Sequence, residues 1–280
     1  TILMGSLLAA GQNLFNIHVL ILASLTTLFL QILSNLANDY GDARSGADND
    51  ERQGPRRMIQ SGTISLKQMK KAVMLTSALA LISGSALIIV SLKGHHLMAF
   101  IFFIMGIAAI AAAIRYTVGK NPYGYRGLGD LHVFIFFGIM GVGGTFFLHT
   151  GTWQWPVLLP ATAIGLFSTG VLNLNNIRDI ESDSKIGKKT LPVLMGRKKA
   201  AVYHLILLTT GWIMLMMWTL FFAPETKGWL LLPALPVFIK NGHSVFRFKR
   251  PAYKLDKELR NLSLGTLLVV LLYGAQMFIF

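Results

Sequence analysis

Long apolar runs recur along this chain and constrain its fold more than any other feature. An α-helix needs about 20 apolar residues to cross the roughly 30 Å hydrocarbon core of a bilayer, and unpaired backbone groups exclude open structures there. The short alternating strands of a membrane barrel are not seen. We therefore predict an all-α polytopic membrane protein with about nine transmembrane helices. The predicted spans are residues 1–13, 17–38, 68–92, 95–114, 129–149, 154–175, 201–222, 228–240 and 262–280.

The amount and the placement of charge support this class. Only 14% of the 280 residues are charged, whereas a soluble domain carries about 25%. The formal charge is +14, but 24 of the 26 Lys and Arg residues fall in four windows between predicted spans. The windows are 41–71, 115–127, 177–202 and 240–260. Basic loops on one side are typical of the cytoplasmic face, so the pattern argues against nucleic-acid binding and predicts a cytoplasmic N-terminus.

The chain is predicted to be one transmembrane domain, residues 1–280, with a weak internal repeat. Asn38-x-x-x-Asp42 ends the second span, and Asn175-x-x-x-Asp179 ends the sixth span 137 residues later. This predicts two related halves, about 1–128 and 129–280, around a central cavity open to the cytoplasmic side. Because Thr1 lies inside an apolar segment, we expect residues to be missing before it. The absence of cysteine excludes thiolate metal ligands.

The two matched segments carry the clearest chemical signal. Asn38 and Asp42 share a helix face if the helix continues that far, and Asn175, Asp179 and Asp183 share another. Mg²⁺ takes one or two carboxylates and completes its shell with water and phosphate oxygens. The surrounding basic residues are Arg44, Arg57, Lys120, Arg178, Lys185 and Lys189. Acids interleaved with bases indicate Mg²⁺ with a polyanion such as diphosphate. Solvated loop charge is the alternative, and the matched spacing argues against it.

A third segment, RYTVGKNPYGYRGLGD (Arg115–Asp130), joins two spans on the same side. Tyr116 and Lys120 are four residues apart, and the glycines and Pro122 predict a tight irregular turn. Asp130 is its one nearby acid. An ordinary cytoplasmic turn explains this composition equally well.

In these three segments the chain resembles the UbiA-type membrane aromatic prenyltransferase superfamily. The signature of that superfamily is two Asp-rich motifs on cytoplasmic loops of a nine-helix fold, here NDYGDARSGAD (Asn38–Asp48) and NNIRDIESD (Asn175–Asp183). The resemblance is greatest to the subgroup that prenylates 1,4-dihydroxy-2-naphthoate in menaquinone synthesis. The first motif departs from a simple D-x-x-x-D pattern, because Gly46 stands where the second acid belongs and the acid follows at Asp48.

The resemblance implies a role for each matching residue. Mg²⁺ would be bound by Asn38, Asp39, Asp42, Asp48, Asp179 and Asp183. The substrate diphosphate would be contacted by Arg57, Lys120, Lys185, Lys189 and Asn175. Asp42, Asp179, Tyr116 and Lys120 would be catalytic, with Tyr116 near the reacting carbon.

The implied activity is Mg²⁺-dependent transfer of a polyprenyl group from polyprenyl diphosphate to 1,4-dihydroxy-2-naphthoate, with loss of CO₂ and diphosphate, giving demethylmenaquinol. The enzyme would lie in the bacterial cytoplasmic (inner) membrane with its site facing the cytoplasm, and its partners would be the two substrates and membrane lipid. Two alternatives stay open. One is another acceptor such as 4-hydroxybenzoate. The other is a transporter with a cytoplasmic cation site, although a transporter would place its polar groups near the midplane.

Overall fold

The computed structural model describes residues 1–45, 59, 61–119, 122–223, 228–247 and 255–279. All regular structure in these residues is helical, which confirms the predicted all-α class. The helices are α1 (Ile2–Ala10), α2 (Ile17–Ser45), α3 (Leu66–Ser91), α4 (His96–Arg115), η1 (Tyr123–Arg126), α5 (Gly129–Val133), η2 (Phe134–Gly144), α6 (Thr145–Thr150), η3 (Trp155–Val157), α7 (Leu158–Arg178), α8 (Ile180–Lys185), α9 (Leu191–Phe221), η5 (Gly228–Ala234), α10 (Leu235–Phe246) and α11 (Leu255–Ile279).

Seven helices are long and apolar enough to cross a membrane within the described part of the chain. They are Ile17–Arg44, Leu66–Ser91, His96–Arg115, Gly129–Thr150, Trp155–Arg178, Leu191–Phe221 and Leu255–Gln276. The predicted count of nine is not confirmed, because the other two predicted spans correspond to shorter helices. One is α1, and the other is the pair η5 and α10, which Pro233 and Pro236 interrupt. Proline lacks the N–H that a continuous helix would use.

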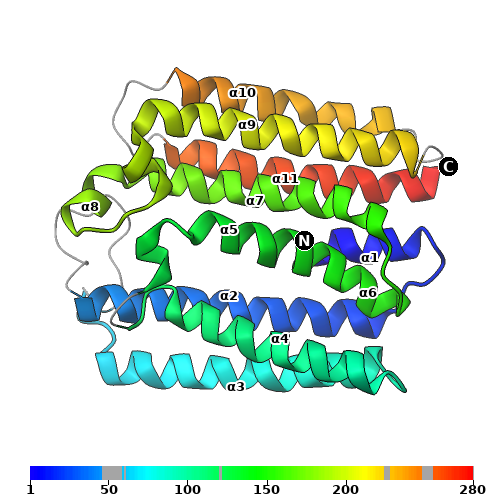
Figure 1. Ribbon diagram of the computed structural model, residues 1–280, viewed down its shortest axis with the longest axis horizontal. Helices are drawn as coiled ribbons and strands as arrows, with labels where there is room; N and C mark the ends of the chain where they lie inside the picture. Colours follow the sequence, from blue (N-terminus) through cyan, green and yellow to red (C-terminus); the bar gives the residue numbers. More distant parts are fainter. Residues whose placement is uncertain (46–58, 60, 120–121, 224–227, 248–254, 280) are drawn as a thin grey trace.

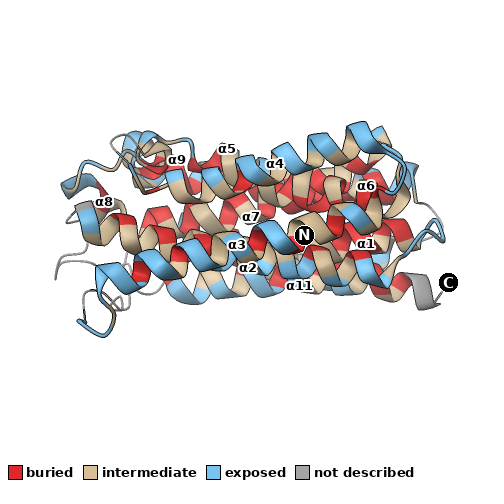
Figure 2. Cartoon of the chain, turned by 90° about the horizontal axis from the view of Figure 1, so that it is seen from below, coloured by how far each residue is buried: buried red, intermediate tan, exposed pale blue. Residues whose placement is uncertain are grey.

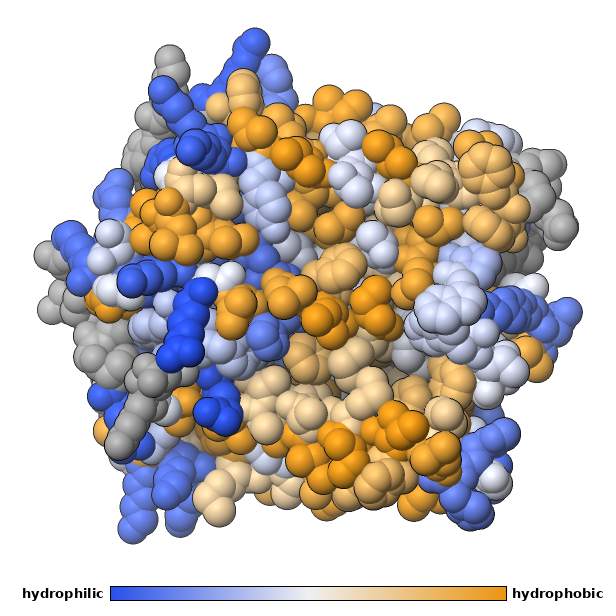
Figure 3. All heavy atoms as spheres, in the orientation of Figure 1, coloured by the Kyte–Doolittle hydropathy of each residue, from blue (hydrophilic) through white to orange (hydrophobic). Residues whose placement is uncertain are grey.

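Apolar side chains point outward from these helices, as they do in a protein solvated by lipid. Leu75, Ile82 and Ile89 follow each other at intervals of seven along α3, and each is more than 60% exposed. Figure 2 shows such exposed stretches along the outer helices. In Figure 3 the apolar residues form a broad central belt, and the hydrophilic ones gather at the two ends. A bilayer can therefore surround the middle of the bundle.

The long helices lie roughly parallel in two groups. In Figure 1, α2, α3 and α4 form one group, and α7, α9, α10 and α11 form the other, with α1, α5 and α6 between them. The larger apolar core lies in the second group, where the Phe167 ring is 4.6 Å from that of Phe238, which in turn is 5.3 Å from Trp212. The π-helix η2 packs closely on α7, because a Cβ on Gly138 would come within 2.6 Å of the Ala161 carbonyl oxygen. Duplication of the two halves stays a prediction.

The α9 helix begins ten residues before its predicted start at residue 201. It bends at Gly196, whose φ of 78° and ψ of 158° suit glycine alone among ordinary residues. The basic run after this bend, residues 197–199, is predicted as loop because its charges hide the helical pattern. In the structure it is part of α9.

Candidate active site

A cavity of about 370 Å³ lies between the two helix groups, near the end at which α2 and α7 finish. Its walls come from α2 and α4 on one side and from α5, η2, α7 and α8 on the other. The lining residues that carry polar groups include Asn35, Asn38, Asp42, Tyr116, Thr117, Tyr123, His132, Asn175, Asn176, Asp179, Asp183 and Lys188. The structure therefore brings both predicted acidic segments to one cavity.

On the first side of the cavity, the helix continues far enough to align its polar pair. The α2 helix runs to Ser45, so Asn38 and Asp42 lie one turn apart and both line the cavity. Tyr125 donates a hydrogen bond from its hydroxyl to Asp42 Oδ1 at 2.8 Å. A Cβ on Gly41 would come within 2.8 Å of the Thr117 carbonyl oxygen, so glycine allows the segment after α4 to pack against α2.

Thr117 connects the same segment to the predicted ligand on α2. Its hydroxyl lies 3.0 Å from the Ala37 carbonyl oxygen and 3.1 Å from Asn38 Oδ1, so it can donate to one of the two. The side chain of Thr117 is buried. These contacts hold Asn38 on the cavity wall.

On the second side, the polar face continues across a helix break. The α7 helix ends at Arg178, and Asp179 is shared between its end and the start of α8. The backbone amide of Asp179 still donates to the Asn175 carbonyl oxygen at 3.1 Å, and the backbone amide of Asp183 donates to the Asp179 carbonyl oxygen at 2.8 Å. Because the four-residue hydrogen-bond spacing is kept, Asn175, Asp179 and Asp183 all line the cavity.

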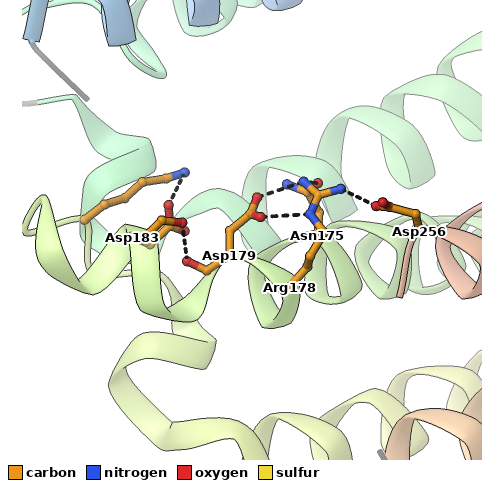
Figure 4. A network of polar contacts seen from close by, with 7 residues as sticks. Asn175, Arg178, Asp179, Asp183 and Asp256 are labelled. Carbon is orange, nitrogen blue, oxygen red and sulfur yellow. Dashed lines mark hydrogen bonds and ion pairs between the residues drawn. The ribbon is translucent and has the colours of Figure 1, made fainter. Parts of the chain in front are cut away.

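Arg178 binds two of these polar residues directly (Figure 4). Its Nε and Nη2 donate to the two carboxylate oxygens of Asp179, each at 2.8 Å, and Nη2 also donates to Asn175 Oδ1 at 2.6 Å. Its third nitrogen, Nη1, lies 2.7 Å from Asp256 Oδ1 at the start of α11. The sequence pattern alone marks Arg178 only as one of the basic residues around the acids.

Lys188, which is not among the predicted diphosphate contacts, is the lysine of this loop that lines the cavity. Its Nζ lies 3.2 Å from Asp183 Oδ1 and 5.9 Å from the centre of the Tyr125 ring. Lys185 and Lys189 are exposed and are not part of the lining. Gly187 has a φ of 73° and lies in a turn. Helical periodicity says nothing about side-chain direction in such a turn, so the sequence could not separate these lysines.

Burial raises the pKa of Asp183, and the charge of Lys188 partly counteracts this effect. The carboxyl therefore takes up a proton more readily than an exposed aspartate would. Its second oxygen, Oδ2, is buried and makes no hydrogen bond. An ion-binding role would explain both properties.

Aromatic rings line the same cavity as these acids. Tyr116 meets Tyr123 edge-on at 5.3 Å, and Tyr123 stacks on His132 at 4.0 Å. Burial raises the pKa of Tyr116, as do, to a smaller extent, Tyr123 and the nearby carboxyls of Asp130, Asp183 and Asp42. Burial also raises the pKa of Tyr123 to about 12. Tyr116 is therefore a neutral phenol whose ring faces the cavity near three acids.

The donor set of the cavity fits Mg²⁺. The described residues contain no group of three His, Cys, Asp or Glu side chains that would enclose a metal by themselves. Mg²⁺ does not require such a cage, because it is commonly bound through one or two carboxylates together with water and substrate phosphates. The carboxylates and amides facing one another across the cavity, with the unpartnered oxygen of Asp183, supply ligands of this kind.

The remaining predicted residues are not placed in the cavity by the structure. Asp39 is half-buried and is not among the lining residues. Asp48, Arg57 and Lys120 lie outside the described residues. Their assigned roles stay predictions.

A second cavity of about 170 Å³ adjoins the first toward the middle of the bundle. The two share five lining residues, which are Thr27, Leu30, Ala109, Phe136 and Gly141. The rest of the second lining is mostly apolar and comes from α1, α2, α3, α4, η2 and α6. The polar cavity thus continues into an apolar one.

Comparison with known proteins gives consistent matches over the whole chain. The profile of the UbiA prenyltransferase family matches residues 1–274. The 1,4-dihydroxy-2-naphthoate octaprenyltransferase of Escherichia coli is 44% identical over 274 residues, which is 96% of this chain and 88% of that protein. The protein of the same name from Haemophilus influenzae is 42% identical over 270 residues, 96% of this chain and 87% of that protein.

Solved structures share the fold at lower identity. The apo structure of a UbiA homolog from Aeropyrum pernix K1 aligns with a TM-score of 0.67 at 18% identity, covering 99% of this chain and 96% of that one. A UbiA homolog from Archaeoglobus fulgidus bound to DMAPP and Mg²⁺ aligns with a TM-score of 0.60 at 15% identity, covering 95% and 89%.

Proposed function

This chain belongs to the UbiA prenyltransferase family, and from that premise we propose that it transfers a polyprenyl group from polyprenyl diphosphate to 1,4-dihydroxy-2-naphthoate. CO₂ and diphosphate are released, and the product is demethylmenaquinol for menaquinone biosynthesis. Identities of 42–44% to enzymes named for this acceptor support the choice of substrate. Family membership also argues against the transporter alternative.

The observation that carries the proposal is the junction of the two cavities. A prenyl diphosphate has a polyanionic head and a long apolar tail. The first cavity offers Lys188 and a set of oxygen ligands for a metal-bound head, and the adjoining apolar cavity offers space for the tail. An acid site without such a neighbour would suit a simple cation better.

Asn38, Asp42, Asp179 and Asp183 are the residues of the described chain that would hold Mg²⁺. When bound, Mg²⁺ neutralises charge that develops on the departing diphosphate. Lys188 adds a positive charge on the same wall, and its attraction to the diphosphate grows as the C–O bond breaks.

The aromatic wall suits the other product of that bond cleavage. The allylic carbon becomes cationic, and the face of a neutral Tyr116 can stabilise it through a cation–π contact of about 1–2 kcal/mol. The apolar side chains of η2 and α4 keep water from this carbon. The prenyl group therefore survives until the naphthoate ring attacks.

The chemistry of the acceptor explains why no general base stands out. The ring carbon that bears the carboxylate forms the new C–C bond, and diphosphate leaves with the electron pair of the C–O bond. Loss of CO₂ then returns an electron pair to the ring, so no proton has to be removed from that carbon. The ring of 4-hydroxybenzoate would instead have to lose a proton at the reacting carbon.

We also propose that the end carrying α8 faces the cytoplasm of a bacterial inner membrane. Exposed basic residues at this end include Lys185, Lys189 and Lys198, as the positive-inside pattern requires. Soluble naphthoate would then reach the cavity from the cytoplasm, and the prenyl donor would enter from the membrane.

One assay tests the proposal against its alternatives. Membranes containing the protein are incubated with a labelled prenyl diphosphate, Mg²⁺ and each acceptor in turn. We expect labelled demethylmenaquinol and stoichiometric CO₂ with 1,4-dihydroxy-2-naphthoate, and no product with 4-hydroxybenzoate. A product with 4-hydroxybenzoate alone would identify a different acceptor, and no transfer to any aromatic acceptor would overturn the proposal.

A further inference from the structure

Arg178 links the predicted metal site to a helix that contributes no residue to the cavity. Its guanidinium lies between Asp179, which lines the cavity, and Asp256 in the first turn of α11. The side chains of Arg178 and Asp179 are 11% and 13% exposed, whereas that of Asp256 is 55% exposed. The contact thus joins a nearly buried ion pair to a solvated carboxylate.

This guanidinium occupies oxygens that a metal would use. Both carboxylate oxygens of Asp179 and the amide oxygen of Asn175 accept hydrogen bonds from it. Arginine cannot lose its proton in a protein, so the competing charge is permanent. A divalent cation at Asp179 would have to displace the guanidinium of Arg178 or bind beside it against charge repulsion.

The guanidinium of Arg178 is also suited to the diphosphate of the substrate. Arginine binds carboxylates and phosphates in the same two-pronged geometry. A diphosphate next to Asp179 would offer Arg178 a new partner and would free Asp179 for the metal. Asp256 steadies the present position, because it holds Nη1 at 2.7 Å while the other two nitrogens face the cavity residues.

We propose that Arg178, positioned by Asp256, clamps the metal site in the absence of substrate and releases Asp179 when the diphosphate binds. Asp256 is a positioning residue in this scheme. The clamp makes tight metal binding depend on the diphosphate, so the metal enters with the prenyl donor. This inference rests on the proposed function, since it assigns a further step to the same site.

The first measurement is metal binding without substrate, with Mn²⁺ alone as the probe. Purified protein in detergent is titrated with Mn²⁺, and the free ion is followed by electron paramagnetic resonance. Arg178→Gln should bind Mn²⁺ about tenfold more tightly than the wild type. Asp256→Asn should bind it about threefold more tightly, because the clamp loses its outer support.

The direction of the Asp256→Asn effect is diagnostic. If Asp256 acted only through the long-range electrostatic field of its charge, removing that charge should weaken cation binding. Glu181→Gln is the matched control, because Glu181 is an exposed acid on α8 that does not line the cavity. It should leave Mn²⁺ binding unchanged or weaken it. In an Arg178→Gln background, Asp256→Asn should have no additional effect.

The second measurement is the KM for prenyl diphosphate at saturating Mg²⁺. Arg178→Gln should raise this KM about tenfold with a smaller change in kcat, because the phosphate partner is lost. Arg178→Lys keeps the positive charge but lacks the paired N–H donors of the guanidinium. Mn²⁺ binding should therefore return toward the wild-type value, while the KM for prenyl diphosphate stays raised. Thermal unfolding of each variant shows which of them are folded.

The outcomes separate this inference from the proposed function. If wild-type protein transfers prenyl groups but Asp256→Asn weakens or leaves unchanged the binding of Mn²⁺, the clamp is wrong and the proposed function stands. If the Mn²⁺ shifts are as expected but the wild type prenylates no aromatic acceptor, the clamp stands and the proposed function fails. If Arg178→Gln does not fold, the comparison of Asp256→Asn with Glu181→Gln still decides the direction.

Discussion

Removal of the hydrogen bond from Tyr125 to Asp42 should affect the proposed metal site without removing any of its ligands. Tyr125→Phe deletes one hydroxyl group, which lies 2.8 Å from Asp42 Oδ1. A hydrogen bond to a charged group is worth about 1.5–3 kcal/mol, and loss of a partner that orients a metal ligand typically costs about 10–100-fold in metal affinity or activity. We therefore expect the Mg²⁺ concentration for half-maximal activity to rise by about 10–100-fold.

The assay is prenyl transfer by purified protein over a range of Mg²⁺ concentrations. At saturating Mg²⁺ the variant should recover most of its activity, because the carboxylate itself remains. Tyr273→Phe is the matched control, since the Tyr273 hydroxyl accepts a hydrogen bond from Trp218 at 3.2 Å outside the cavity. The reasoning is refuted if Tyr125→Phe keeps the wild-type Mg²⁺ dependence, or if Tyr273→Phe changes it equally.

Three further changes test other parts of the site and the fold. Asp42→Ala should lower Mg²⁺-dependent transfer at least about a hundredfold, and EDTA should abolish transfer by the wild type; full activity in either assay would rule out the metal assignment. The carboxyl of Asp183 must be ionised to bind a metal, and burial raises its pKa. In the pH profile of kcat/KM, the loss of activity toward acid should therefore begin at a higher pH than an ordinary aspartate would give. The charge of Lys188 lowers the pKa of Asp183, so in Lys188→Met this loss of activity should begin at a still higher pH. An unchanged pH profile in Lys188→Met would contradict the role given to Asp183. Gly138→Ala should destabilise the protein in detergent by about 1–3 kcal/mol, because its Cβ would meet a carbonyl oxygen of α7 at 2.6 Å, whereas Gly106→Ala has open space around it and should leave Tm unchanged.

Much of the fold was predictable because its signals are local. Apolar length and loop charge indicated a helical membrane protein, and the structure confirms that class. The count of nine spans is not confirmed in the described part of the chain, since Pro233 and the separate short helices η5 and α10 change the geometry without changing the apolar composition. The early start of α9 was missed for a similar reason, because a basic run at a helix end has the composition of a loop.

The helical parts of the candidate site followed from periodicity. Asn38 and Asp42 are one turn apart, and the structure places both on the cavity wall. Asn175 and Asp179 repeat this spacing on the other side. The metal-binding roles of Asn38, Asp42 and Asp179 and the diphosphate contact of Asn175 stay predictions, but the shared position of each pair is a consequence of helix geometry.

By itself, the sequence determined the membrane class, the helical ends at which the acids lie, and the residue types suited to Mg²⁺ and diphosphate. Only the tertiary structure decided which residues support those acids. Tyr125 reaches Asp42 across 83 positions, and Arg178 reaches Asp256 across 78. The physical reason is that such contacts depend on how helices pack and how irregular loops turn. A helix has a period that fixes the direction of each side chain, whereas the turn at Gly187 has none, and so the choice of Lys188 over its neighbours appears only in three dimensions.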